Sequence, residues 1–377
     1  MDTVLNATTA TTRLDHIRAN LDAIRARVGE RLILLAVKAD AYGHGAIEVS
    51  RMAERAGAAD WLGVATTDEA VAIRDAGVRL PVLKLSHALS DAEVAACVER
   101  DVDLTVVSAA TIDQVARIAS GAGRTASVHL KVDTGMRRIG CEPADAPALA
   151  QRADAAGLRL RGLFSHLPVA DTEAGRGFTQ AQVERFRGVV DAVAAARGPV
   201  EIAHLANSGG VLMHPQSWFD MVRPGIMAYG SLPDPDTDPT VPLLPGLEWA
   251  TRVSFVKTVA AGETVGYGRT WTAPRDTTIG TIPVGYGDGY SRLLSNRGRV
   301  LVGGRSCPVV GRVCMDQSMV DLGPDADVAV GDEVVLVGRR AGHLIAVQEL
   351  ADVMGTIPYE VTCLIAARVA RRVVAEA

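Results

Sequence analysis

A lysine follows a short apolar run near the N-terminus, in the stretch VKADAYGHG at residues 37–45. The run LILLA before it has the composition of a buried strand, so Lys38 stands where a strand leaves the core. Most lysines at such places simply reach solvent. A lysine held in a pocket offers other chemistry, because desolvation lowers its pKa and leaves a neutral amine that forms a Schiff base. The stretch alone leaves both interpretations open.

Polar side chains also stand at or beside later apolar runs. They are Lys131 and Asp133 in HLKVDTGMRRIG, His166 in LFSHLPVAD, His204, Asn207 and Ser208 in HLANSGG, and Arg223 in MVRPGIMAYG. Each has an ordinary structural explanation, such as a salt bridge or a satisfied core histidine. Their joint placement favours one functional rim, because such groups are expensive to bury. Glycines beside Ser208 and at Gly225 indicate a phosphate cradle, and with Lys38 this pattern indicates a pyridoxal-phosphate site.

The elements that would position these residues alternate along the first two-thirds of the chain. Amphipathic segments such as IEVSRMAERAG separate the apolar runs Leu32–Val37, Trp61–Ala65, Pro81–Leu85, Asp103–Val107, Ser127–Val132, Arg161–Phe164, Glu201–His204 and Val222–Ala228. This alternation predicts an α/β fold, a (β/α)8 TIM-like barrel, whose functional groups gather at the C-terminal ends of the strands. An open doubly wound sheet would share the alternation. In the barrel, Arg223 would open the eighth strand.

The composition and hydrophobic pattern of the sequence change after the Pro- and Asp-rich segment YGSLPDPDTDPTVPLLPG. Beyond it, β-branched runs bounded by glycine turns predict a C-terminal all-β domain, interrupted by one short helix in AVQELADVMG. We therefore expect residues 1–234 to form the barrel and residues 235–377 to form the β-domain.

Composition excludes several classes of protein. The net charge of -5 gives no basic field for nucleic acid. The five cysteines form no CxxC pair, which argues against a disulfide framework and against a zinc site, so no metal is expected. We see no secretion signal and no apolar run of bilayer-spanning length. These features predict a cytoplasmic protein without a membrane partner.

A family resemblance rests on nine motifs in order: VKADAYGHG, VDTGMRRIG, SHLPVAD, HLANSGG, MVRPGI, TVGYGRTW, IPVGYGDGY, GRVCMDQ and TIPYEV. From about residue 13 to the C-terminus the chain resembles the alanine racemases, pyridoxal 5'-phosphate enzymes with a barrel and a β-domain that work as head-to-tail homodimers. The resemblance implies a two-base interconversion of L- and D-alanine that supplies D-alanine for peptidoglycan. The alternatives are a racemase of another small amino acid, such as serine, and a non-catalytic pyridoxal-phosphate-binding protein.

The resemblance also implies roles for individual residues. Lys38 would hold the cofactor and act as one base, and Tyr267 of the partner subunit would act as the other. The matching cofactor-binding positions are Lys38, Tyr42, His166, Asn207, Ser208, Arg223, Gly225, Ile226 and Tyr359, with His166 beside the ring and Arg223 at the ring nitrogen. The matching substrate-binding positions are Arg138, Tyr286, Met315 and Asp316. Lys131 matches a lysine that is often carbamylated.

These roles are chemically consistent, since racemisation removes a proton from one face of Cα and delivers one to the other face. An arginine at the ring nitrogen does not yield its proton, which shortens the life of the carbanion and suppresses transamination. The chain differs from the usual family sequence at Arg137, Pro168, Gly287 and Ala370 and in the N-terminal segment ATTRL. These departures bear on rate, on specificity and on the pairing of an N-terminal strand. Arg137 and Arg138 compete for the carboxylate role, and register favours Arg138.

Overall fold

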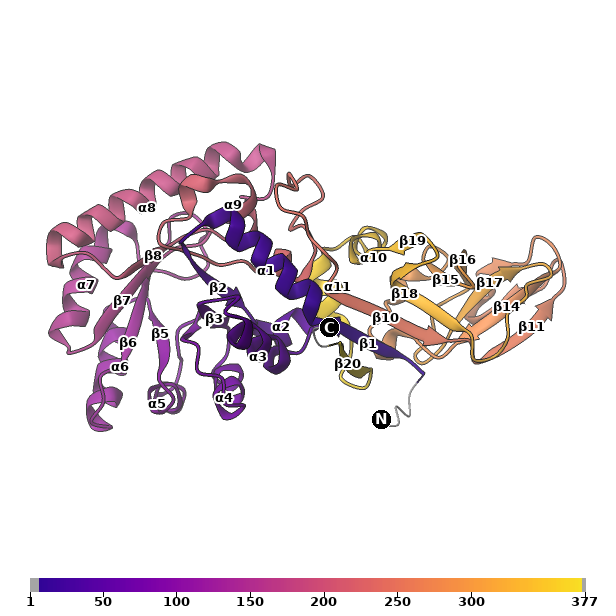
Figure 1. The fold of residues 1–377 in the computed structure, drawn as a ribbon, viewed down its shortest axis with the longest axis horizontal. Helices are drawn as coiled ribbons and strands as arrows, with labels where there is room; N and C mark the ends of the chain where they lie inside the picture. Colours follow the sequence, from indigo (N-terminus) through magenta and orange to yellow (C-terminus); the bar gives the residue numbers. More distant parts are fainter. Residues whose placement is uncertain (1–6, 375–377) are drawn as a thin grey trace. The chain divides into compact units, whose positions relative to one another are not determined.

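The structure is a computed structural model that describes residues 7–374, and its chain folds into two compact units (Figure 1). The barrel unit contains Arg18–Ala41 and Ala46–Leu243. The sheet unit contains the described residues up to Ile17, the segment Tyr42–Gly45 and the described residues from Leu244 onward. Residues 1–6 and 375–377 of the two predicted domains lie outside the described part.

A closed parallel barrel of eight strands forms the centre of the barrel unit (Figure 1). In chain order the strands are β2 (Leu32–Ala36), β3 (Trp61–Val64), β4 (Val82–Lys84), β5 (Val102–Val106), β6 (Ser127–Lys131), β7 (Arg159–Phe164), β8 (Ile202–His204) and β9 (Met221–Val222). Pairing of β9 with β2 closes the ring. The connecting helices are α2 (Lys38–Gly43), α3 (Ala46–Ala56), α4 (Thr67–Asp75), α5 (Asp91–Glu99), α6 (Ala109–Gly121), α7 (Ala146–Ala155), α8 (Arg176–Arg197) and α9 (Ser208–Met213). The predicted barrel is therefore confirmed, and the open sheet is excluded.

Side-chain caps turn the chain from strand to helix at three successive connections. Thr66, Ser90 and Ser108 precede α4, α5 and α6, and each accepts a hydrogen bond from the backbone N–H three residues later. Such caps satisfy N–H groups that the first helical turn leaves without partners. Short capped connections bring the C-terminal ends of the parallel strands to one rim of the barrel.

The eighth barrel strand is shorter than the prediction of Val222–Ala228. β9 ends at Val222, and Ile226–Tyr229 forms a 3-10 turn. Pro224 has no N–H to donate to a neighbouring strand, which explains why the ladder stops. Arg223 thus directly follows the last strand instead of opening it, and the Pro224–Ile226 segment lies in the connection beyond the strand.

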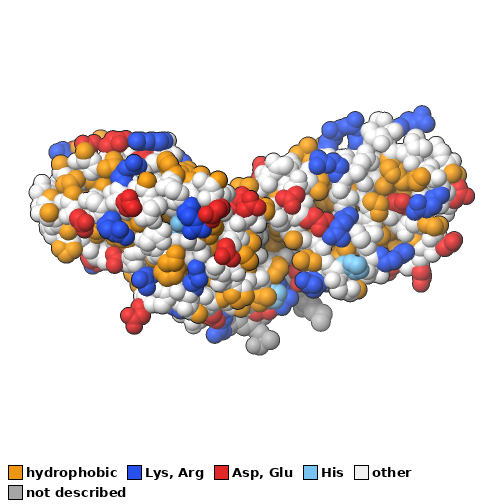
Figure 2. Space-filling model, turned by 90° about the horizontal axis from the view of Figure 1, so that it is seen from above, with side chains coloured by type: hydrophobic (Ala, Val, Ile, Leu, Met, Phe, Trp, Pro, Cys, Tyr) orange, Lys and Arg blue, Asp and Glu red, His pale blue; other side chains and the backbone are white. Residues whose placement is uncertain are grey.

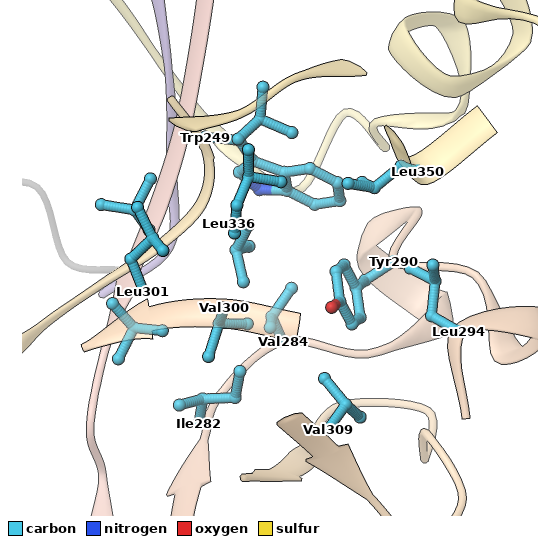
Figure 3. Packing of buried hydrophobic residues seen from close by; sticks show 14 of the residues in the cluster. Trp249, Ile282, Val284, Tyr290, Leu294, Val300, Leu301, Val309, Leu336 and Leu350 are labelled. Atoms are coloured by element: carbon cyan, nitrogen blue, oxygen red, sulfur yellow. The ribbon is translucent and has the colours of Figure 1, made fainter. Parts of the chain in front are cut away.

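The main sheet of the sheet unit is mostly antiparallel and has the order β11-β14-β17-β16-β15-β18-β10-β1-β20, with β19 beside β18. Its strands are β1 (Thr9–Arg13), β10 (Leu247–Arg252), β11 (Phe255–Val259), β14 (Thr277–Ile282), β15 (Arg299–Val302), β16 (Arg305–Val310), β17 (Ser318–Gly323), β18 (Glu333–Arg340), β19 (His343–Ile345) and β20 (Ala370–Val374). Its apolar core centres on Trp249 and Tyr290, whose ring centroids lie 5.8 Å apart in an edge-to-face arrangement. Leu336 and Leu350 lie close to these rings (Figure 3). The predicted C-terminal β architecture is confirmed.

The sheet unit differs from the prediction at both of its ends. β1 pairs antiparallel with β10 and parallel with β20, so the described N-terminal residues belong to this unit, whereas the prediction assigned residues 1–234 to the barrel. The alternating burial of β1 suits a sheet with one covered face. The departures ATTRL and Ala370 fall in this strand pair, and the pairing is intact. The short helix predicted in AVQELADVMG is confirmed as α10 (Val347–Met354), and a second helix, α11 (Pro358–Leu364), follows it without having been predicted.

Candidate active site

Lys38 begins α2, a turn of left-handed backbone that follows β2. The four residues after it, Ala39 to Tyr42, have φ between 51° and 55°. L-residues in this conformation are strained by about 1–2 kcal/mol each, and such strain gathers at functional sites. Contacts outside the turn hold it in place, since the Glu69 carboxylate accepts the Ala39 N–H at 2.7 Å and the Asp40 carboxylate accepts the Ala46 N–H at 2.7 Å.

The rim of the barrel carries an excess of positive charge around Lys131. Burial lowers the pKa of Lys131 to about 7, and the charges of Arg223, Arg138 and Lys38 act in the same direction. Asp133 opposes them and is the one carboxylate among these influences. Three cationic side chains and one carboxylate around Lys131 suit an anionic ligand. Lys131 itself, with so low a pKa, is largely a neutral amine above pH 7.

Arg223 lies buried beneath this rim and donates to neutral acceptors. Its guanidinium reaches His204 Nδ1 at 3.0 Å, Ser165 O at 2.7 Å, Leu205 O at 2.9 Å and His166 Nδ1 at 3.3 Å. Burial lowers the pKa of Arg223 to about 9. Burial and Arg223 hold the pKa of His166 well below its usual range, so His166 is neutral. A guanidinium has five N–H donors, which leaves capacity for a further acceptor such as a ring nitrogen.

Ser208 joins the two glycine-containing connections of the predicted phosphate cradle. Its Oγ accepts the N–H of Gly225 at 3.0 Å and that of Met227 at 3.5 Å, on either side of Ile226. A hydroxyl that accepts in this way directs its own hydrogen elsewhere, for example towards a phosphate. Asn207 uses both ends of its amide within the barrel unit, because Oδ1 accepts from Gly210 N–H and Nδ2 donates to Leu167 O. Asn207 therefore shapes the cradle.

The two arginines after β6 have different surroundings. Arg137 forms an ion pair with Glu142 at 2.7 Å, whereas the charge of Arg138 acts on Lys131. This arrangement favours Arg138 for the carboxylate role. Arg137 also has a φ of 56°, a conformation that glycine adopts without strain.

Two further phosphate candidates lie together in the sheet unit. The rings of Tyr42 and Tyr359 are 5.8 Å apart, and Tyr359 belongs to α11. Gly43, with a φ of 81°, lets the backbone approach α11, because a Cβ there would lie 2.3 Å from the Thr362 carbonyl oxygen. Burial raises the pKa of Tyr42, which keeps it a neutral phenol that can donate a hydrogen bond.

The remaining candidates of the sheet unit are exposed. Tyr267, Met315 and Tyr286 have exposed fractions of 73%, 53% and 43%. Tyr267 lines a shallow hollow with Cys314, Met319 and other residues of this unit. Asp316 is ion-paired with Arg368 at 2.8 Å. Several large side chains named by the family resemblance are therefore open to solvent in the single chain.

Sequence reasoning missed polar residues inside and around the barrel. Lys84 is the last residue of β4 and so occupies a strand end, as Lys38 does after β2. The Lys84 amine donates to the carbonyls of Ser86 and His87 and lies 3.5 Å from the Glu93 carboxylate. The same strand-end signal would have found it. Asp103, His129 and Glu69 carry no comparable signal, because they stand within strands or within a helix.

Other kinds of site find no support in the part of the chain that the structure describes. Between residues 7 and 374, no group of histidine, cysteine and acidic residues could hold a metal ion. No helix in the same range is long and apolar enough to cross a membrane. The visible face of each unit mixes acidic and basic side chains, without a large basic patch (Figure 2).

Comparison with known proteins agrees with the geometry. Residues 12–233 match the family described as "Alanine racemase, N-terminal domain", and residues 246–373 match "Alanine racemase, C-terminal domain". An alanine racemase of Cutibacterium acnes is 48% identical over 95% of both chains, and one of Mycobacterium tuberculosis is 42% identical over 95% of this chain and 94% of the relative.

Solved structures give the same result. The alanine racemase of Streptomyces coelicolor superposes with a TM-score of 0.92 at 39% identity, covering 100% of both chains. That of Clostridium difficile gives 0.93 at 34% identity, covering 99% of this chain and 97% of the other. With both family domains matched in order and identity sustained along the chain, this protein belongs to the alanine racemase family.

Proposed function

We propose that this protein interconverts L- and D-alanine with pyridoxal 5'-phosphate bound at the rim of the barrel. The observation that carries the proposal is the excess of positive charge around Lys131, next to a lysine on a strained turn. The residues present fit the cofactor, which brings an aldehyde for Lys38, a phosphate for Ser208 and Tyr42, and a ring nitrogen for Arg223. Tyr359 and the backbone at Gly225 and Ile226 complete the phosphate side.

The barrel residues divide the work at the substrate. Pyridoxal phosphate, when bound, withdraws electrons from an attached amino acid and so makes its Cα proton removable. The Lys38 amine would hold the cofactor and would remove or deliver the Cα proton on its own side of the substrate. Arg138 binds the substrate carboxylate through a charge-assisted hydrogen bond. His166 stays neutral beside the ring, because burial and Arg223 lower its pKa.

Lys131 orients Arg138 in this proposal. A neutral amine reacts with carbon dioxide to give a carbamate and a proton, and the pKa of about 7 makes this available to Lys131. The carbamate would replace a buried amine with an anion that accepts hydrogen bonds from Arg138. Its negative charge would also offset the positive charges of Arg138 and Arg223.

Arg223 controls the outcome of the reaction. Its pKa of about 9 keeps it charged at neutral pH, so it would donate a hydrogen bond to the ring nitrogen and keep its own proton. An unprotonated ring would withdraw fewer electrons from Cα of the substrate, which would favour reprotonation there. A partner that protonated the ring would spread the charge and favour transamination.

The second base is Tyr267 of another copy of the chain, so the working enzyme is a homodimer. Exposure of Tyr267, Met315 and Tyr286 supports this proposal, because a partner subunit would cover these side chains. Tyr267 would act on the face of Cα opposite to Lys38, with Met315, Asp316 and Tyr286 lining the approach of the substrate. The product D-alanine serves peptidoglycan synthesis.

A chiral assay of the purified protein tests the function. The protein is incubated with a panel of L-amino acids that includes alanine and serine, and both enantiomers of each are measured. We expect a yellow protein that racemises L-alanine fastest. Faster turnover of serine would reassign the substrate, and a yellow protein that racemises nothing would favour a non-catalytic carrier of the cofactor.

A further inference from the structure

A line of polar side chains crosses the interior of the barrel from the N-terminal to the C-terminal ends of its strands. Asp103 is the second residue of β5, His129 lies in the middle of β6, His204 ends β8 and Arg223 follows β9. Their exposed fractions are 4%, 0%, 0% and 6%. Buried polar groups are retained at a cost in stability unless partners satisfy them, so an unbroken line calls for an explanation.

Hydrogen bonds link Arg223 to His204 and His204 to His129, and an ion-pair contact links His129 to Asp103. Arg223 reaches His204 Nδ1 at 3.0 Å, and His204 Nε2 lies 2.9 Å from His129 Nδ1. His129 Nε2 then lies 3.3 Å from Asp103 Oδ2, a distance that fits an ion-pair contact but a direction that is poor for a hydrogen bond. Arg161 approaches the same carboxylate at 3.1 Å and shields it at the N-terminal mouth of the barrel.

The two ends of the line determine the proton positions between them. Arginine can only donate, so Nδ1 of His204 accepts and its proton is on Nε2. His204 Nε2–H then donates to His129 Nδ1, which places the proton of His129 on Nε2, facing Asp103. The Asp103 carboxylate 3.3 Å from His129 Nε2 favours the same direction by electrostatic attraction. Every donor in the line therefore points away from Arg223 and towards Asp103.

The barrel is built to hold these rings. Gly162 on β7 leaves the space for His129, because a Cβ at Gly162 would lie 2.1 Å from His129 Nδ1. Trp61 meets the His129 ring edge-on at 5.5 Å, and Phe164 stacks on the His204 ring at 4.8 Å with an interplanar angle of 8°. Both imidazoles are thus fixed in position as well as in tautomer.

We propose that Asp103 is a positioning residue for Arg223 and acts through His129 and His204 as a remote counter-charge. The proposal rests on the proposed function, in which Arg223 serves the cofactor ring nitrogen. Within residues 7–374, no carboxylate accepts a hydrogen bond from Arg223, and the neighbouring rim charges are mostly cationic. A polarised line that ends in a carboxylate favours the charged guanidinium and fixes its orientation.

Imidazole nitrogen NMR tests the line without depending on activity. The chain has eight histidines, so protein labelled with nitrogen-15 histidine gives a tractable spectrum, and His129→Gln and His204→Gln assign the two rings. We expect both rings in wild-type enzyme to be neutral with the proton on Nε2. A proton on Nδ1 of either ring, or a charged ring, would overturn the proposal even if the protein racemises alanine normally.

Two substitutions at the Asp103 end of the line should shift the Nε2 signals of His129 and His204 in opposite directions. Asp103→Asn removes the charge, so the Nε2 signals of His129 and His204 should move towards weaker hydrogen bonding. Arg161→Met keeps Asp103 but removes its competing donor, so both signals should move the other way. Asp101→Asn is the matched control, since Asp101 is exposed, pairs with Arg124 and lies outside the line. If Asp103→Asn does not fold, Arg161→Met and the wild-type spectrum still decide.

The kinetic effect should separate positioning from general damage. Asp103→Asn should lower kcat by about threefold to tenfold, as residues that act at a distance do, with a smaller change in KM for alanine. Asp101→Asn should leave both unchanged. An unchanged His204 signal in both Asp103→Asn and Arg161→Met would show that the far end does not reach Arg223, and the proposal would fail.

Discussion

The barrel unit and the sheet unit hold their candidate site residues in opposite ways. In the barrel, Arg223 and Lys131 are buried, and Arg223 is held by several hydrogen bonds. In the sheet unit, the side chains of Tyr267 and Met315 are exposed, and the hydrophobic core around Trp249 does not include them. The barrel residues of the proposed site are therefore preorganised within one chain, whereas the exposed residues of the sheet unit complete a site only if a second molecule covers them, as proposed above.

The largest effect should come from the barrel half. Lys38→Ala removes the primary amine that binds the cofactor, so activity should fall by about a thousandfold or more and the visible absorbance should disappear. Borohydride should fix the cofactor on the peptide that contains Lys38 in the wild-type protein. Lys84→Met is the matched control, because Lys84 is another buried strand-end lysine, and it should keep the absorbance. Label on Lys131 or Lys84 would refute the assignment.

Arg223→Glu should lower racemisation by about a hundredfold while the cofactor stays bound. A carboxylate would stabilise a protonated ring nitrogen, so some turnovers should end in transamination. Pyruvate formation from alanine and a new absorbance at longer wavelength are the measurements. If neither appears, Arg223 does not serve the ring nitrogen.

Lys131→Met should slow the reaction by about tenfold, since it removes a group that orients Arg138. With carbon-13 bicarbonate, the wild-type protein should show a carbamate signal that the variant lacks. The lowered pKa sets the direction of the pH dependence: the amine is neutral and reactive above about pH 7 and protonated below it, so the signal should fade as the pH drops. A wild-type protein without the signal at pH 8 would rule out the carbamate.

The smallest effect concerns the strained turn. Glu69→Ala removes the acceptor of the Ala39 N–H and the capping box with Thr66, so the free energy of unfolding should fall by about 1–2 kcal/mol. Glu48→Ala, which removes only an exposed pair with Arg51, should change it by less than about 0.5 kcal/mol. Urea denaturation measures both. Equal changes in the two variants would mean that Glu69 does not support the turn.

The alternation of apolar runs and amphipathic segments predicted the barrel. The polar residues at strand ends predicted much of its rim, because burial there is costly for a polar residue and the pattern is therefore visible in sequence. The alternation failed at the last strand, where Pro224 ends the ladder after Val222. The left-handed turn after Lys38 was not predictable, because alanine and tyrosine seldom adopt positive φ and the contacts that hold them, such as Glu69, come from another helix.

Interior partners were hidden for a related reason. His129 and Asp103 stand within apolar strands, and only the closed barrel brings them together and shows why Gly162 has no side chain. Pairing of β1 with β20 joins residues near opposite ends of the chain, which no local pattern can report. The roles of Tyr267 and Met315 came from the family resemblance alone, since isolated exposed residues carry no local signal.

A mixed-dimer experiment tests most directly whether each site is made from two chains. Lys38→Ala and Tyr267→Phe proteins should each be nearly inactive alone. Unfolded together in equal amounts and refolded with pyridoxal phosphate, about half of the dimers should be mixed, each with one intact site of two, so roughly a quarter of wild-type D-alanine formation should return. Differently tagged chains that co-purify prove the exchange. If the chains exchange and no activity returns, Tyr267 either acts within its own chain or is not a base, and the account is contradicted.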